Sequence, residues 1–378
     1  MSFTAIEPCA DYEESAVRYA LDRVLSAVGG LDWVKPGMKI AVKANLVTMM
    51  KPESAATTHP MLLCALCERL ISRGASVVVG DSPGGLYASA YVNAVYAATG
   101  VRAVLKTGAS LNQDFGHRHA DNPGGTVLKE LEYTSWLDDA DAIINFCKLK
   151  THGMMGMSAC VKNMFGAIPG AFKPEYHYKY PSHEQFANML VDLNERFRPR
   201  LCVVDAVVGM EGNGPTMGRP RRIGALIAGT SPYACDRVCA RVIGLDPDGL
   251  ETVRAARARG LEDEATVVGD VSSFVVSDYD LVRARKDISF DRELPGFAGK
   301  ALGKLLQSAL CAVPKVSEAE CVGCERCMNI CPAKAIRMEN RLPRIDRGAC
   351  IRCFCCQEFC PKGAMKVRRP LIARLINR

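Results

Sequence analysis

The chain has 378 residues, is 48% hydrophobic and carries a net charge of +7, so it can bury a large core in more than one domain. Its first residues lack a basic stretch followed by an apolar one, and no run of about 18 apolar residues occurs, which excludes a readable secretory signal and a transmembrane helix. We therefore expect a cytoplasmic protein.

Strands and helices are predicted to alternate along the first half of the chain. Apolar runs, helical spacing and glycine or proline at the ends define the elements. In chain order they are a strand at Lys39–Val47, a helix at Pro60–Arg73, a strand at Ser76–Val79, a helix at Leu86–Ala98, a strand at Arg102–Lys106 and a strand at Ala142–Phe146. This βαβ order predicts an α/β fold with a mostly parallel sheet and helices on both faces.

The second half begins in the same way and then changes character. The predicted elements are a helix at His183–Phe197, a strand at Leu201–Val208, a glycine-rich loop at Gly209–Gly218, a strand at Ile223–Ala228, a helix at Ala234–Val242 and a strand at Ala265–Gly269. The expected domains are an α/β domain at 1–282, a linker at 283–314 with a short helix near 298–310, a cysteine-rich domain at 315–367 and a basic tail at 368–378.

Eight of the 18 cysteines follow one strict repeated pattern. The pattern C-x2-C-x2-C-x3-C-P occurs twice with an offset of 29 residues, at Cys321, Cys324, Cys327 and Cys331 and again at Cys350, Cys353, Cys356 and Cys360. This spacing is typical of two [4Fe–4S] clusters, in which the fourth cysteine of each run binds the other cluster. Two zinc sites are the alternative, although zinc sites do not need a third cysteine three residues further on.

Basic residues concentrate in the same part of the chain. Residues 283–378 carry 20 Lys/Arg against 9 Asp/Glu. Such a module can bind nucleic acid, but these residues alternate with the cysteines and would offset the negative charge of two thiolate-bound clusters. We therefore expect no nucleic acid partner and instead a redox partner protein.

Polar, glycine-bearing segments follow several predicted strands. Ligands of parallel sheets bind beyond the carboxyl ends of the strands. The candidate catalytic residues are Lys150, His152 and Lys162, which can bind an anionic group and donate protons. Residues that would orient a substrate or cofactor are Asp81, Asn163 and Glu211. His152 could equally be a structural histidine with no catalytic role. Cys64 and Cys67 could be side chains of the apolar core.

The chain resembles the domain-of-unknown-function family 362 in three segments, KLKTHGMMGMSACVKNMFG, VVDAVVGMEGNGPTMG and AGTSPYACDRVCARVIGL. A fourth, CIRCFCCQEFCP, is typical of members with a C-terminal two-cluster ferredoxin module. The resemblance runs from about Lys39 to Val367. It implies an iron–sulfur protein of mostly anaerobic or facultative microbes, with a small α+β bacterial ferredoxin-like domain, and it brings no established reaction.

Three functions remain open. The first is an oxidoreductase in which the ferredoxin domain feeds electrons to a small anionic substrate or a cofactor at the α/β strand ends. The second is an electron carrier or adaptor that docks a partner redox enzyme without its own catalysis. The third is a metallochaperone or cluster-assembly factor that binds a metal through His152 with Cys147 and Cys160. These residues provide few ligands for a metal site.

Overall fold

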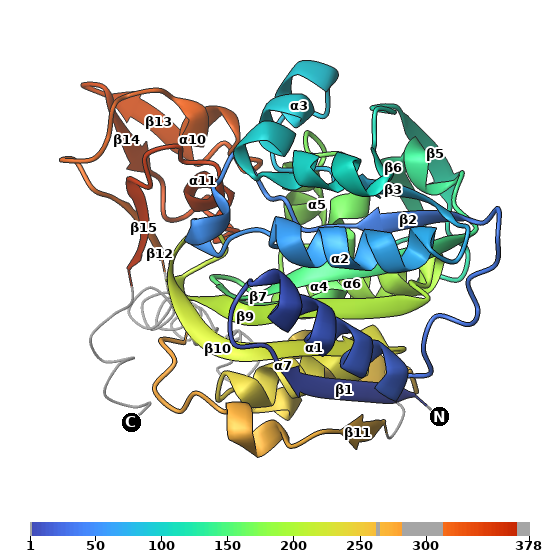
Figure 1. Cartoon of the computed structure of the whole chain (residues 1–378). Coiled ribbons are helices and arrows are strands. Elements are labelled where there is room, and N and C mark those ends of the chain that lie inside the picture. The colour runs from blue at the N-terminus through green and yellow to red at the C-terminus, as the bar shows by residue number, and fades with distance from the viewer. Residues whose placement is uncertain (1, 262–264, 282–312, 369–378) are drawn as a thin grey trace. The chain divides into compact units, whose positions relative to one another are not determined.

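The computed structural model describes residues 2–261, 265–281 and 313–368 (Figure 1). The chain divides into two compact units. The α/β unit comprises residues 1–173 and 184–282, and the cysteine-rich unit comprises residues 174–183 and 283–378. Apart from residues 313, 314 and 368, the expected linker with its helix and the expected basic tail lie outside the described residues.

One mixed, mostly parallel sheet is the framework of the α/β unit, and it confirms the predicted fold class (Figure 1). Its strands are β1 (Phe3–Pro8), β2 (Lys39–Lys43), β3 (Ser76–Gly80), β4 (Ser110–Leu111), β7 (Ala142–His152), β8 (Gly156–Ser158), β9 (Leu201–Asn213), β10 (Met217–Gly229) and β11 (Thr266–Val268). The order across the sheet is β11-β1-β10-β9-β7-β2-β3-β4, with β8 beside β7. The central strands β9, β7, β2 and β3 are parallel, whereas β10 is antiparallel to both of its neighbours.

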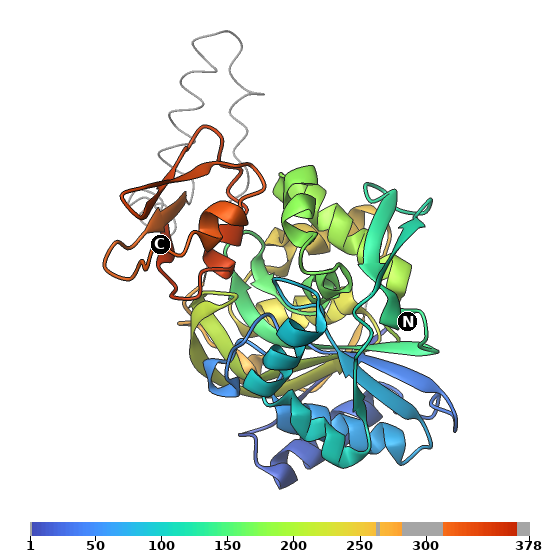
Figure 2. The same ribbon diagram turned by 90° about the horizontal axis from the view of Figure 1, so that it is seen from above.

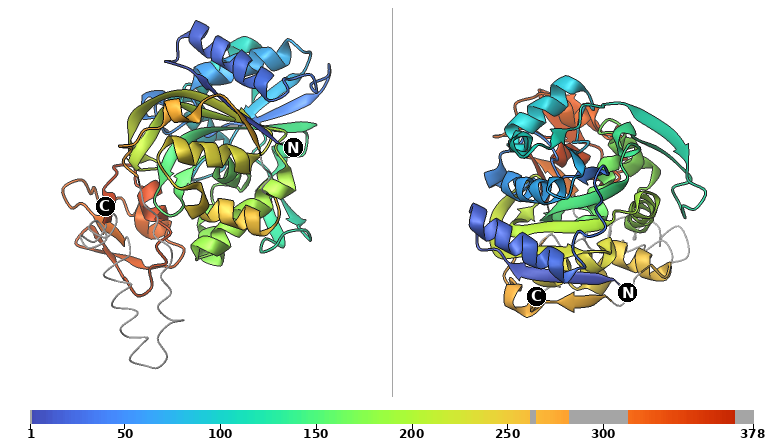
Figure 3. Two further views of the ribbon diagram at one scale, coloured as in Figure 1. Left: turned by 90° about the horizontal axis from the view of Figure 1, so that it is seen from below. Right: turned by 45° about the vertical axis from the view of Figure 1, so that its right-hand side comes forward.

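Helices cover both faces of this sheet (Figure 2). The first face carries α1 (Glu14–Ala27), α2 (Pro60–Ile71) and α3 (Ser89–Ala98). The second face carries α4 (Cys160–Asn163), α6 (His183–Phe197), α7 (Pro232–Val242) and α8 (Glu251–Ala258), and Figure 3 shows the same layers from two other sides. A separate hairpin is formed by β5 (His117–Asp121) and β6 (Glu130–Thr134).

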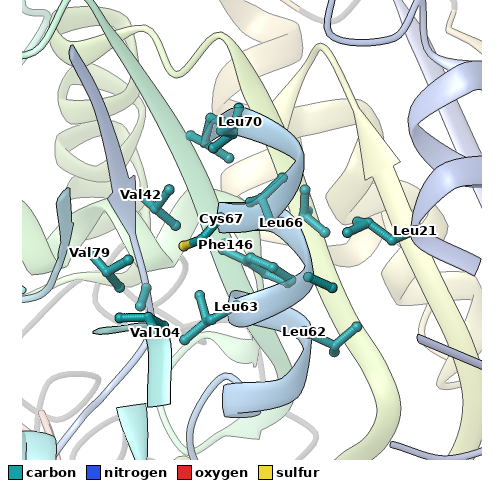
Figure 4. Packing of buried hydrophobic residues seen from close by; sticks show 14 of the residues in the cluster. Leu21, Val42, Leu62, Leu63, Leu66, Cys67, Leu70, Val79, Val104 and Phe146 are labelled. Carbon is teal, nitrogen blue, oxygen red and sulfur yellow. The ribbon is translucent and has the colours of Figure 1, made fainter. Parts of the chain in front are cut away.

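Alternate side chains of the central strands build the core on the first face (Figure 4). Val42 of β2, Val79 of β3 and Phe146 of β7 are fully buried in one cluster with Leu63 and Cys67 of α2. Burying one large apolar side chain stabilises the fold by roughly 1.5–3 kcal/mol. The alternation therefore fixes which face of each strand meets α2, and it sends the intervening residues to the other face.

The strand predicted at Arg102–Lys106 is wrong. Residues Val101–Thr107 form a 3₁₀ helix, and the edge strand β4 begins only at Ser110. In a 3₁₀ helix, side chains three residues apart lie on one side. Val101 and Val104 are buried whereas Leu105 is exposed, so the apolar residues follow that period rather than the alternation of a strand.

The glycine-rich loop predicted at Gly209–Gly218 is also wrong. The segment belongs to a long hairpin in which β9 continues to Asn213 and β10 begins at Met217. The glycines permit close approach: a Cβ atom at Gly214 would overlap the carbonyl oxygen of Thr151. Glycine here serves packing against β7 rather than an open loop.

The described part of the cysteine-rich unit is built from two similar halves. Its strands are β12 (Val313–Val316), β13 (Ile336–Glu339), β14 (Leu342–Ile345) and β15 (Met365–Arg368), and its short helices are α10 (Arg326–Asn329) and α11 (Cys355–Glu358). β12 pairs with β15 and β13 with β14, both antiparallel. Most of α5 (Lys173–Lys179) also belongs to this unit. Throughout the described residues, no helix is both long and apolar enough to cross a membrane.

Candidate functional site

Nine cysteines line two cavities in the cysteine-rich unit, and eight of them belong to the repeated pattern. The first cavity is lined by Cys321, Cys324 and Cys327 together with Cys360. The second is lined by Cys350, Cys353 and Cys356 together with Cys331, and also by Cys355, which lies outside the repeat. Each run of three cysteines thus meets the fourth cysteine of the other run, a grouping that suits ligand exchange between two cubane clusters. Cluster binding by these cysteines stays a prediction.

The backbone around the two cavities repeats with the same offset as the cysteines. Glu325 and Phe354, 29 residues apart, both have φ near +60° immediately before α10 and α11. Gly323 and Arg352 form a second left-handed pair. A left-handed conformation costs a non-glycine residue roughly 1–2 kcal/mol. Successive amides turned in this way form concave nests that suit anionic groups, including iron–sulfur sites.

The fourth cysteine of each run accepts a backbone hydrogen bond. The Ala335 amide donates to Cys331 Sγ at 3.3 Å, and the Ala364 amide donates to Cys360 Sγ at 3.2 Å. Both alanines are buried, so these bonds are shielded from water. Hydrogen bonds to cysteine sulfur are one of the factors that set the reduction potential of an iron–sulfur cluster.

In the α/β unit, the carboxyl ends of β2 and β3 hold a buried ion pair. Lys43 Nζ lies 2.8 Å from Asp81 Oδ1, and it also donates to Asn163 Oδ1 at 3.1 Å. Asn163 Nδ2 in turn donates to Asn145 Oδ1 of β7 at 2.8 Å. Burial lowers the pKa of Lys43, while the neighbouring Asp81 carboxylate acts in the opposite direction. Two of the predicted site residues, Asp81 and Asn163, therefore belong to one polar network, and Lys43 connects them.

A second buried ion pair lies between β7 and β9. Lys148 Nζ is 2.8 Å from Asp205 Oδ2 and donates to the Tyr12 hydroxyl, also at 2.8 Å. Tyr12 donates to Asp205 Oδ1 at 2.9 Å and stacks on the His59 ring with centroids 3.6 Å apart. Burial lowers the pKa of Lys148, and it lowers the pKa of His59 to about 4. The predicted site residues include none of these four.

The predicted residues Lys150 and His152 lie at the end of β7 and are fully buried. Lys150 Nζ donates to Asn45 Oδ1 at 2.5 Å and to the Ala56 carbonyl at 2.7 Å. His152 Nδ1 accepts the amide hydrogens of Met154 and Met155, each at 3.1 Å. Since Nδ1 is an acceptor, the neutral ring carries its proton on Nε2.

The two remaining predicted residues make different contacts. Lys162 is half-buried, with Nζ 5.4 Å from the centroid of the Phe165 ring. Glu211 lies on the β9–β10 hairpin, where it pairs with Arg219 at 3.3 Å and accepts the Asp280 amide at 3.1 Å. Glu211 and Asp81 therefore belong to separate polar networks.

Four buried cysteines gather on the second face of the sheet. Cys147 and Cys160 have their Sγ atoms 3.7 Å apart, and Cys160 also contacts Cys202 and Cys235. Within residues 2–261, 265–281 and 313–368, no three His, Cys, Asp or Glu side chains are arranged to hold one metal ion. The metallochaperone hypothesis stays a prediction.

Comparison with known proteins gives four likenesses. The family described as "Domain of unknown function (DUF362)" matches residues 40–241, and a 4Fe-4S dicluster domain matches residues 314–361. The thylakoid-associated protein sll1697 of Synechocystis is 32% identical over 257 residues, which cover 67% of this chain and 78% of that protein. The lactate racemase apoprotein from Thermoanaerobacterium thermosaccharolyticum is 13% identical with a TM-score of 0.39, over 62% of this chain and 56% of that one. The last likeness is too low to bear on function.

Proposed function

Because this chain belongs to the DUF362 family and ends in a 4Fe-4S dicluster domain, we propose that it is an iron–sulfur oxidoreductase with two [4Fe–4S] clusters. The cysteine-rich unit feeds electrons to a substrate or cofactor bound at the strand ends of the α/β sheet. The observation that carries the proposal is the pairing of each run of three cysteines with the fourth cysteine of the other run.

Eight cysteine ligands hold the clusters in this proposal. One set is Cys321, Cys324, Cys327 and Cys360, and the other is Cys331, Cys350, Cys353 and Cys356. Two clusters supply one-electron chemistry. The left-handed turns at Gly323, Glu325, Arg352 and Phe354 direct backbone amides around the two cavities, and the Ala335 and Ala364 amides bond the ligand sulfurs.

In this proposal, a small anionic substrate binds at the strand-end residues of the α/β unit. Lys150 and Lys162 bind its negative charge and supply a proton, and His152 donates a hydrogen bond from Nε2. Asp81, Asn163 and Glu211 act as orienting residues, Asp81 by holding Lys43 and Glu211 by holding Arg219. Lys43 at the carboxyl end of β2 and Lys150 near the carboxyl end of the adjacent parallel strand β7 support this placement.

The test uses anaerobically purified protein with reduced methyl viologen as donor and a panel of small carboxylates and phosphates as acceptors. Once an acceptor is found, the His152→Ala variant should keep its iron and lose turnover. Normal turnover by that variant would show that the role assigned to His152 is wrong. The Tyr178→Ala variant, which removes an exposed side chain, is the matched control.

The second candidate is an electron carrier or adaptor without its own catalysis. One observation favours it: Lys150, Thr151 and His152 are fully buried and bond backbone groups, as residues of a structural turn do. Anaerobic affinity purification decides between the two. Co-purification of a flavin or metal enzyme, with no acceptor reduced by the chain alone, would favour the adaptor. We keep the cytoplasm as the proposed location, to be checked by fractionation.

A further inference from the structure

The residues that line the two cysteine cavities differ in their exposure. Exposed residues in the lining of the first cavity are Val322, Cys324, Glu325, Arg326, Pro361 and Lys362. In the second cavity, each described residue of the lining is buried or half-buried, including Cys353 and Cys356. The sequence repeat therefore produces two sites of similar backbone and unequal exposure.

Basic side chains surround the exposed cavity. Arg326 and Lys362 are exposed members of its lining, and Glu325 is the acidic one. Exposed Arg341 lies beside the same loop, since its Nε would be 3.3 Å from a Cβ atom at Gly323. Val322, in the same lining, is 50% exposed and adds an apolar side chain two residues from Cys324. Residues 313–368 as a whole carry 11 Lys/Arg and 6 Asp/Glu.

We infer that the face formed by Val322, Cys324, Arg326, Arg341 and Lys362 docks an acidic electron-transfer protein. This inference rests on the proposed function and deepens it: electrons enter the chain through the cluster bound by Cys321, Cys324, Cys327 and Cys360. One electron passes per encounter, so the partner is oxidised by one electron and the cluster is reduced by one, with no bond made or broken.

Two physical arguments select this face. Electron tunnelling weakens steeply with distance, and an exposed ligand such as Cys324 gives a docked partner its shortest path to a cluster. Opposite charges speed the encounter of two proteins by up to several orders of magnitude at low salt. Exposed basic side chains beside the small apolar side chain of Val322 thus suit a transient, acidic partner rather than a permanent subunit.

The test is stopped-flow reduction of the oxidised full-length protein by a reduced acidic flavodoxin as probe. Charge reversal on this face, Arg326→Glu or Lys362→Glu, should lower the second-order rate constant about tenfold at low salt and flatten its salt dependence. The matched control is Arg337→Glu, whose side chain is 77% exposed, which lines neither cavity and which should change the rate less than about twofold.

The outcomes separate this inference from the function beneath it. Dithionite, a small reductant, should reduce all variants at one rate if their clusters are intact. If Arg326→Glu, Lys362→Glu and Arg337→Glu, all with full iron content, are reduced by flavodoxin at the same rate, the docking face is wrong. The proposal of two clusters would be unaffected by that result. A wild-type chain without iron would instead overturn the proposed function.

Discussion

The Lys43 ammonium lies 2.8 Å from the Asp81 carboxylate, and their side chains are 0% and 4% exposed. A second ion pair, Lys148 with Asp205, is buried as deeply on neighbouring strands. Taking charges out of water is costly, so each member of such a pair depends on its partner. The two pairs hold the strand ends of the α/β unit in one arrangement, and they tie β2 and β7 to segments distant in sequence.

Removing one member of the buried pair should be strongly destabilising. We expect Asp81→Ala to lower the free energy of unfolding by about 3–5 kcal/mol, because the Lys43 charge stays buried without its carboxylate. The exposed pair of Arg73 with Asp32 is the control, and Asp32→Ala should cost less than about 1 kcal/mol. Urea unfolding followed by circular dichroism measures both. Similar losses for the two variants would contradict the account.

Gly166 should tolerate no side chain. A Cβ atom there would overlap both the Asp81 carboxylate and the end of the Lys43 side chain. Gly166→Ala should therefore cost about 1–3 kcal/mol of stability by forcing the ion pair apart. Gly124 has no atom near its Cβ position, so Gly124→Ala should change stability by less than about 0.5 kcal/mol. Thermal unfolding of the two variants tests the difference.

His59 should make the fold less stable in mild acid. Burial lowers its pKa from 6.5 to about 4, so between these values the unfolded chain binds a proton that the folded chain does not. The contribution of His59 to the free energy of unfolding is therefore fully present above pH 6.5, and it is lost as the pH falls toward about 4. Urea midpoints across that range should fall less for His59→Asn than for the parent. Parallel curves would show that His59 titrates normally.

Exchange of the fourth cysteine has a spectroscopic consequence. Cys324→Ala and Cys360→Ala should abolish the same electron paramagnetic resonance signal, although the residues belong to different runs, and each variant should keep about four irons. Cys331→Ala should abolish the other signal. Cys355→Ala, which removes a cysteine outside the repeat, should keep about eight irons. Loss of different signals in Cys324→Ala and Cys360→Ala would refute the exchange.

The sequence predicts those parts of the fold in which local spacing decides the structure. The helix His183–Phe197 has the predicted bounds because its apolar residues recur on one helical face. The 3₁₀ helix at Val101–Thr107 was missed because short apolar runs do not distinguish strand from helix. The β9–β10 hairpin was missed because its glycines resemble loop glycines, although Gly214 is needed for packing against Thr151.

Some parts of the candidate site can likewise be predicted from local spacing, and others cannot. The cysteine repeat is readable because the eight residues are spaced within short motifs. The partners of the buried lysines are not, since Tyr12 meets Asp205 across 193 positions and only the folded sheet brings them together. One signal was available: Lys43 and Lys148 are charged residues within apolar strands, where an unpaired charge is costly.

The most direct measurement is iron and acid-labile sulfide per chain after strictly anaerobic purification, by plasma mass spectrometry and colorimetry. We expect about eight of each, as two cubane clusters require. Zinc in place of iron, or iron without matching sulfide, would contradict this expectation.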